Sequence, residues 1–322
     1  MVTTPLSPLT ESTLLEQVVE LARRAGHGIG DGLEPHTHWK ADGSPVTIYD
    51  RKAHQVIVAG LRSIDPEIPI VSEESGVPPA ADRAGWTRFW LVDPLDGTRE
   101  FVEKLPDYTV NIALIEHGVP VLGAVYAPAR EVTYYASRQG GAFRAATGER
   151  PVRVSSRPPV PGAALRIVES RAHRSPDLDA FAAGLPVAER LAVGSSLKFC
   201  WIAEGRADLY PRFTPIMEWD VAAGDCVFRW SSATGTPHYS PLTYNNPEMR
   251  IADFVLGFMP PAPAVVWFTG LPGAAKTTIA RLVRERLMRV GSPVELLDGD
   301  EIRARFPNTG FTRAERDTHI RR

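Results

Sequence analysis

The spacing of apolar residues along the chain predicts a mixture of helices and strands. Between residues 11 and 25 the apolar positions recur at helical spacing, which predicts a helix that buries one wide face and ends near Gly26. Shorter continuous apolar runs predict buried strands. We expect these strands at residues 68–71, 89–92, 108–116, 119–126, 132–135 and 165–168.

Capping residues predict where further helices begin. Thr47 and Asp50 have the spacing of a capping box, so we expect a helix from there to about Leu61. Ser195 is a favourable N-cap for a second helix. The remaining pattern predicts a strand at 204–212, a helix that begins near Asp220 and continues through residue 227, and a final strand within 237–258.

Composition narrows the class of protein. The 322 residues suffice for a large core and two domains. The 36 basic and 38 acidic residues nearly balance, which argues against a nucleic-acid-binding surface over the whole protein. Two cysteines, Cys200 and Cys226, do not make a disulfide framework. We therefore expect a protein of the reducing cytoplasm, with no signal peptide and no membrane span.

The densest group of candidate functional residues follows the second predicted strand. Asp93 and Asp96 lie in a turn that a proline stiffens, and the Leu95 carbonyl lies between them. Carboxylate and carbonyl oxygens are the hard ligands that Mg²⁺ prefers. Gly97 lets the backbone approach a ligand closely, and Thr98 adds a hydroxyl. For a bare pair of aspartates, the structural alternative is a solvent-exposed type I turn.

The hexapeptide D-P-L-D-G-T at residues 93–98 resembles the signature of the inositol monophosphatase superfamily, the lithium-sensitive, Mg²⁺-dependent phosphomonoesterases. Three further stretches are similar to motifs of that superfamily and occur in its order. They are K-x-D-G-S-P-V-T-x-x-D, which ends at Asp50, the S-E-E element with Glu73, and W-D-x-A-A-G with Asp220. The resemblance implies a layered α-β-α-β-α fold.

The same resemblance implies a catalytic site with two or three Mg²⁺ ions. The implied metal ligands are Glu73, Asp93, the Leu95 carbonyl, Asp96 and Asp220. Thr98 and Asp50 would orient or deprotonate the attacking water. The structural alternative for Asp50 is a capping residue that the helix dipole favours.

Residues 194–212 resemble the bacterial 3′(2′),5′-bisphosphate nucleotidases more closely than the inositol monophosphatases. The implied activity is hydrolysis of the 3′-phosphate of adenosine 3′,5′-bisphosphate to AMP and phosphate. The implied substrate contacts are Gly97, Thr98, His173, Ser195, Lys198, Arg212 and Asp220. Structural alternatives are a polar surface loop for His173 and an exposed helix lysine for Lys198. An inositol or sugar monophosphatase and a non-catalytic nucleotide sensor are the alternative functions.

The end of the chain has a different character. A Pro-rich linker at 260–264 separates an expected domain of residues 1–259 from an expected domain of residues 265–322. The latter carries a degenerate P-loop, in which Ala275 stands where the pattern requires glycine. The matching P-loop residues are Gly270, Gly273, Lys276 and Thr277.

This P-loop and the later strings L-D-G-D and G-F-T-R-A-E-R-D-T-H-I-R-R resemble adenylylsulfate kinase. Only two candidate strands remain, fewer than a buried parallel sheet needs, so we expect no independent kinase activity. The tail would instead dock on the first domain or pair with another chain, as a homo-oligomer or with a kinase partner. Adenylylsulfate kinase makes the sulfate donor whose spent form is adenosine 3′,5′-bisphosphate, so both resemblances indicate sulfate assimilation.

Overall fold

The computed structural model describes residues 10–29, 37–39, 45–160, 162–171, 175–231, 242–258, 275–289 and 296. The chain divides into two compact units, Met1–Met259 and Pro260–Arg322. In the second unit the described residues form helix α8 (Lys276–Arg289). Within the described ranges, no helix combines the length and the apolar character needed to cross a membrane.

The first unit is built on a seven-stranded sheet. Its strands lie in chain order, and they are β3 (Ile70–Ser72), β4 (Arg88–Asp96), β5 (Thr109–Glu116), β6 (Val119–Ala127), β7 (Val132–Ser137), β8 (Gly141–Ala146) and β9 (Val152–Arg153). Strand β3 pairs parallel to β4, and every later pair is antiparallel. Between β5 and β6 the turn residues His117 and Gly118 both have positive φ, which is the geometry of a tight two-residue hairpin.

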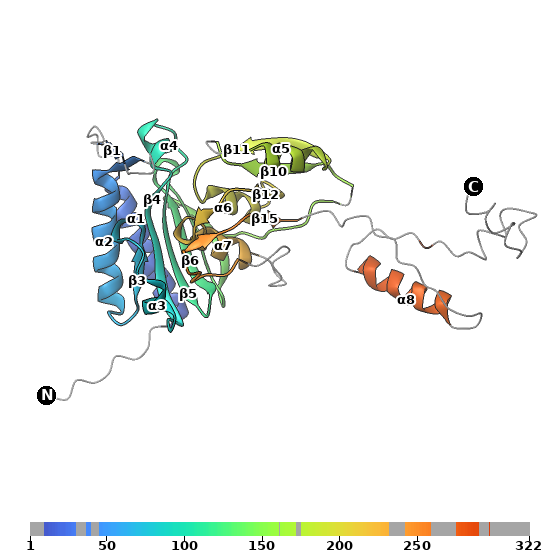
Figure 1. Ribbon diagram of the computed structural model, residues 1–322, viewed down its shortest axis with the longest axis horizontal. Helices are drawn as coiled ribbons and strands as arrows, with labels where there is room; N and C mark the ends of the chain where they lie inside the picture. The colour runs from blue at the N-terminus through green and yellow to red at the C-terminus, as the bar shows by residue number, and fades with distance from the viewer. Residues whose placement is uncertain are drawn as a thin grey trace, which may run out of the picture. The chain divides into compact units, whose positions relative to one another are not determined.

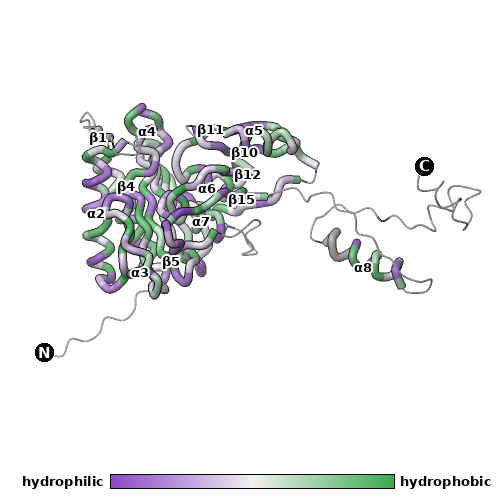
Figure 2. Tube along the Cα trace, in the orientation of Figure 1, coloured by the Kyte–Doolittle hydropathy of each residue, from purple (hydrophilic) through white to green (hydrophobic). Residues whose placement is uncertain are grey.

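Both faces of this sheet are covered by helices (Figure 1). Helices α1 (Glu11–His27) and α2 (Ile48–Ile64) share one hydrophobic core with Trp90 and Val92 of β4. The alternate residues Phe89 and Leu91 lie in a second core with α6 (Leu197–Ala203) and α7 (Glu218–Arg229). Because successive side chains of a strand point to opposite faces, an uninterrupted apolar strand serves both cores. Figure 2 shows apolar residues gathered along these strands.

A second sheet lies beyond α6 and α7. Its strand order is β11 (Val187–Ala192), β10 (Leu165–Glu169), β12 (Leu209–Arg212) and β15 (Phe254–Gly257). Helix α5 (Pro176–Ala183) packs on this sheet through a small core of Leu165, Ile167, Ala182 and Leu209. The layers therefore run α-β-α-β-α, and the predicted architecture is confirmed (Figure 1).

The remaining elements are short. They are β1 (Thr37–Trp39), β2 (Pro45–Thr47), η1 (Glu73–Ser75), α3 (Ala80–Arg83), α4 (Thr98–Val102), η2 (Pro128–Arg130), β13 (Ile216–Met217) and β14 (Arg250–Ile251).

Helix α1 ends at His27, near Gly26 as predicted. Gly26 itself packs closely, because a Cβ there would lie 2.5 Å from Cδ1 of Tyr126. Two other predicted boundaries are wrong. Ser195 is not the N-cap of α6, which begins at Leu197; Ser195 lies two residues earlier with φ of +54°. The strand predicted from residue 204 begins only at Leu209, because residues 204–208 form the turn that follows α6.

Candidate active site

The end of strand β4 holds the first two carboxylates of the site. Asp93 is paired with Asn111 of β5 and Asp96 with Thr109, so β4 has one extra residue in a bulge between the two aspartates. The Asp93 carboxylate accepts the Leu95 N–H at 3.0 Å, which fixes the turn. The bulge and this bond hold both carboxylates near one edge of the sheet.

Two more carboxylates approach from other elements. Asp220 is the third residue of α7, and its Oδ2 accepts the Met217 N–H at 3.3 Å. The negative charge of Asp220 acts on the Asp93 carboxyl group. Burial, followed by the negative charges of Glu73 and Asp96, raises the pKa of both. Four carboxylates from β4, η1 and α7 therefore act on one another electrostatically.

The chemistry of this donor set fits a hard divalent cation. Asp93 is buried, Glu73, Asp96 and Asp220 are half-buried, and carboxylates that repel one another in such surroundings need a positive charge. Mg²⁺ prefers oxygen ligands. In the described part of the chain, no three carboxylate, histidine or cysteine side chains already stand in a metal-binding arrangement. The fit rests on the type, burial and charge of the groups, so the metal site at Glu73, Asp93, Leu95, Asp96 and Asp220 stays a prediction.

Thr98 and Asp50 do come together in the structure. The Thr98 hydroxyl lies within donating distance of Asp50 Oδ1, at 3.3 Å, and of the Leu95 carbonyl oxygen, at 3.1 Å. Asp50 Oδ2 meanwhile accepts the Thr47 N–H and hydroxyl, which completes the predicted capping box of α2. The pKa of Asp50 is raised, because the effect of burial exceeds the lowering by its hydrogen bonds from Thr47. Asp50 is thus a helix cap through one oxygen and a partner of Thr98 through the other.

Gly97 connects β4 to α4 in a conformation that favours glycine. Its φ is +87°, in the left-handed region, and a Cβ there would lie 3.1 Å from the Asp107 carbonyl oxygen. Any side chain at this position would therefore strain the turn. The predicted contact of the Gly97 and Thr98 amides with phosphoryl oxygens stays a prediction.

The residue at the start of α6 that bonds to the carboxylates is Ser196. Its N–H donates to Asp96 Oδ2 at 2.6 Å, and its hydroxyl donates to the Asp220 backbone carbonyl at 2.6 Å. Asn111 Nδ2 lies 3.2 Å from Asp96 Oδ2 and 3.0 Å from Ser196 Oγ. Neither Ser196 nor Asn111 was predicted from the sequence to be a site residue. Asn111 could have been found, because it is a single amide within an apolar strand.

Two cationic side chains reach the same region. Lys198 is buried, donates to the Ser195 carbonyl at 2.6 Å and lies 5.5 Å from the centroid of the Tyr210 ring. The alternative of an exposed helix lysine is therefore wrong. Burial raises the pKa of Asp96, and the positive charge of Lys198 lowers it in part. Arg212, on β12, likewise opposes the rise in the pKa of Asp220.

Some predictions fall outside the described residues. They are His173, Gly270, Gly273 and, apart from Leu296, the two candidate strands of the tail. Lys276 and Thr277 are the first two residues of α8. Ala275 precedes them with φ of +55°. This conformation favours glycine, the residue that the P-loop pattern expects there.

The chain belongs to the inositol monophosphatase family, whose sequence profile matches residues 10–234. The profile of adenylylsulphate kinase matches residues 262–322. Among curated relatives, the 3′(2′),5′-bisphosphate nucleotidase CysQ of Salmonella typhimurium is 48% identical over 221 residues, which are 66% of this chain and 86% of the relative. The CysQ nucleotidase of Escherichia coli K12 is 44% identical over 253 residues, or 74% of this chain and 99% of the relative.

Solved structures agree with this assignment. The crystal structure of CysQ from Bacteroides thetaiotaomicron, described as a bacterial member of the inositol monophosphatase family, matches with a TM-score of 0.64 and 33% identity. The match covers 77% of this chain and 98% of that protein. A Staphylococcal inositol monophosphatase in complex with products, at 20% identity and a TM-score of 0.63, shows the shared fold.

Proposed function

We propose that this protein is a Mg²⁺-dependent 3′(2′),5′-bisphosphate nucleotidase, which hydrolyses the 3′-phosphate of adenosine 3′,5′-bisphosphate to AMP and phosphate. The relatives with that name, at 44% and 48% identity, support the assignment. The observation that carries it is that the positive charges of Lys198 and Arg212 act on Asp96 and Asp220, two carboxylates of the cluster. One phosphate would lie at the carboxylates, and these two cations would hold the second phosphate, which a monophosphate substrate lacks.

Glu73, Asp93, Asp96, Asp220 and the Leu95 carbonyl would hold two or three Mg²⁺ ions. When bound, such ions activate water and stabilise the charge of the leaving oxygen. The Thr98 hydroxyl, which lies within hydrogen-bond distance of Asp50, would orient the attacking water and pass its proton towards that carboxylate. The raised pKa of Asp50, a consequence of its burial, suits a proton acceptor.

In this reaction the oxygen of water forms the new bond to phosphorus, and the bond from phosphorus to the ribose 3′-oxygen breaks. The 3′-oxygen leaves as a hydroxyl after it takes up a proton. Ser196 and Asn111 would position Asp96 through their hydrogen bonds. His173, Ser195 and the side of Asp220 that faces the substrate are further proposed nucleotide contacts.

We also propose a division of labour along the chain. Residues 1–259 would carry hydrolysis, and residues 260–264 would be a linker. Residues 265–322 would be an adenylylsulfate kinase-like segment through which the chain forms a homo-oligomer or meets a kinase partner. We further propose that the protein acts in the cytoplasm, in sulfate assimilation. The family match to residues 262–322 supports the kinase-like character of the tail.

A phosphate-release screen tests the function. The full chain with Mg²⁺ is assayed on adenosine 3′,5′-bisphosphate, inositol 1-phosphate and a sugar phosphate. We expect kcat/KM to be highest for the nucleotide, by about tenfold or more, because only the nucleotide places a phosphate on each charged region. Higher kcat/KM on inositol 1-phosphate would instead assign an inositol monophosphatase. ATP binding without phosphate release from any substrate would assign a nucleotide sensor.

A further inference from the structure

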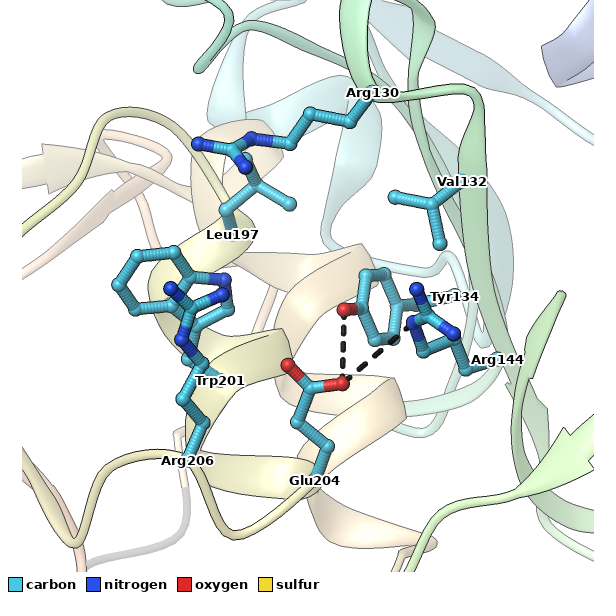
Figure 3. Close-up of a pocket in the computed structure, with 8 residues that line it drawn as sticks. All are labelled: Arg130, Val132, Tyr134, Arg144, Leu197, Trp201, Glu204 and Arg206. Carbon is cyan, nitrogen blue, oxygen red and sulfur yellow. Dashed lines mark hydrogen bonds and ion pairs between the residues drawn. The ribbon is translucent and has the colours of Figure 1, made fainter. Parts of the chain in front are cut away.

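A charged cavity lies on the face of helix α6 that carries Leu197 and Trp201. Leu197, Trp201 and Glu204 follow one another at the helical spacing of i, i+4 and i+7, and they line one side of a cavity of about 290 Å³. Strands β7 and β8 supply the opposite side through Tyr134 and Arg144. Figure 3 shows these side chains directed into a common space.

Three arginines from three different places in the chain line this cavity. Arg130 ends η2, Arg144 lies on β8, and Arg206 lies in the turn after α6. They approach the cavity from different sides (Figure 3). Three guanidinium groups thus face a single lining carboxylate, that of Glu204, which gives the cavity an excess of positive charge.

The single lining carboxylate is already engaged. Glu204 Oε2 accepts the Tyr134 hydroxyl at 3.0 Å and lies 3.8 Å from Arg144 Nε. Arg130 forms an ion pair with Asp107, but Asp107 also binds Arg171. Two arginines therefore share that one carboxylate, so Glu204 and Asp107 together leave the cavity with an excess of positive charge.

The arginines also keep donors for a ligand. Arg206 stacks on the Trp201 ring, with its guanidinium carbon 3.6 Å from the ring centroid. Stacking uses the face of the guanidinium, while its N–H donors point outward in the plane. The Arg144 side chain is 38% exposed and its ion pair with Glu204 is long, so it has donors available to a molecule in the cavity.

We propose that this cavity is a binding site for a small phosphate-bearing anion. Guanidinium groups match phosphate oxygens in geometry and charge, and three of them around one space suit a tetrahedral group better than a planar carboxylate. The cavity is near the lower end of the volumes of ligand pockets, about 300 Å³, so it suits inorganic phosphate or a small phosphate ester. This site is separate from the carboxylate site, and it does not depend on the proposed function.

The test is a titration of the full chain followed by NMR. The indole N–H signal of Trp201 reports on the cavity, and it is assigned as the one of the seven tryptophan signals that Trp201→Phe removes. Inorganic phosphate and ribose 5-phosphate are added separately at constant ionic strength, in the presence of EDTA, so that no metal ion supports binding at the carboxylates. The same titrations are run on Arg144→Gln and Arg206→Gln. The matched control is Arg138→Gln, an arginine that pairs with Glu116 away from the cavity.

We expect a saturable shift of the Trp201 signal. The Kd should be at least about tenfold higher in each cavity variant and unchanged in the Arg138→Gln control, because a charge-assisted phosphate bond is lost only in the former. Tighter binding of ribose 5-phosphate identifies an ester as the ligand, and equal or tighter binding of inorganic phosphate identifies the free ion; both support the site. The absence of a saturable shift, or equal Kd values in the original protein and both cavity variants, would overturn the proposal.

Discussion

Helix α6 presents opposite electrostatic surroundings on two of its faces. Beside its first turn, Ser196 and Lys198 meet the carboxylates of β4 and α7. On its other face, Trp201 and Glu204 meet three arginines. The acidic region needs a cation and the basic region needs an anion, because in each the charges of one sign outnumber their partners. In our two proposals, one short helix therefore borders two sites with different ligands.

The largest effect is expected from Asp96→Asn at the acidic face. The substitution keeps the size of the side chain but removes the charge of a proposed metal ligand, so kcat/KM on the bisphosphate nucleotide should fall by more than about 100-fold. In EDTA, the unfolding temperature of the variant should be no lower than that of the unchanged protein. The substitution removes a negative charge that is disfavoured at this position by loss of solvent. Steady-state kinetics and thermal denaturation check both statements.

The matched control for this variant is Asp82→Asn, an exposed aspartate on α3. It should retain the activity of the original protein. Near-normal turnover of Asp96→Asn at saturating Mg²⁺ would show that this carboxylate is not a metal ligand.

Ser196→Ala tests whether the hydroxyl at the start of α6 positions the carboxylates. The variant keeps the backbone N–H that donates to Asp96 but loses the hydroxyl bonds to Asn111 and the Asp220 carbonyl. We expect kcat/KM to fall by about tenfold, mostly through kcat, because the carboxylates are less well positioned. Ser63→Ala, at an exposed serine of α2, is the control. Equal kinetics in the two variants would show that the hydroxyl of Ser196 positions nothing.

Asp107→Asn tests how much the ion pairs of Asp107 with Arg130 and Arg171 stabilise the fold. Burial raises the pKa of Asp107, but hydrogen bonds from Arg130 and Arg171 outweigh it and lower the pKa overall. A lowered pKa means that the ionised group stabilises the fold at neutral pH, and that this contribution is lost as the pH falls through the folded-state pKa. At pH 7 we expect the free energy of unfolding to fall by about 2 kcal/mol.

Urea denaturation of both proteins over a pH series measures this difference. It should shrink as the pH falls below 3.8, the ordinary value for the aspartate carboxyl. A difference of the same size at every pH would show that the ion pairs with Arg130 and Arg171 are not its cause. Asp82→Asn again serves as the control.

The smallest effect is expected from deletion of residues 262–322. Every residue named on the two faces of α6 lies in the first unit, so kcat/KM for the nucleotide should change by less than about twofold. The full chain should show no ATP-dependent phosphorylation of adenylylsulfate. Loss of hydrolysis in a well-folded truncated protein, or measurable kinase turnover in the full chain, would contradict the division of labour.

The acidic site was predictable because its residues occur in short motifs. Asp93, Asp96 and Thr98 lie within six residues of one another, and Asp50 adds a helix-capping pattern. The apolar pattern also predicted the strands, while the layered class of fold was implied by the resemblance to the superfamily. The N-cap of α6 was predicted wrongly, because a serine pair offers two candidates and only the tertiary bonds of Ser196 distinguish them.

The basic cavity could not be predicted from the sequence. Arg130, Arg144 and Arg206 belong to separate elements, and no local pattern distinguishes them from other surface arginines. They meet only because β7 and β8 lie opposite one face of α6. Asn111 was predictable only in part. Its amide is unusual within an apolar strand, but the sequence does not show that the fold brings Ser196 beside it.

The most direct test of the central claim is the identity of the product. Adenosine 3′,5′-bisphosphate is incubated with the full chain, with Mg²⁺ or with EDTA, and ³¹P NMR follows the two phosphates separately. We predict that the 3′-phosphate signal alone is lost, that inorganic phosphate and adenosine 5′-monophosphate appear in equal amounts, and that EDTA stops the reaction. Release of the 5′-phosphate, or the same rate in EDTA, would contradict the proposal that the carboxylates beside α6 hold the metal for hydrolysis at the 3′ position.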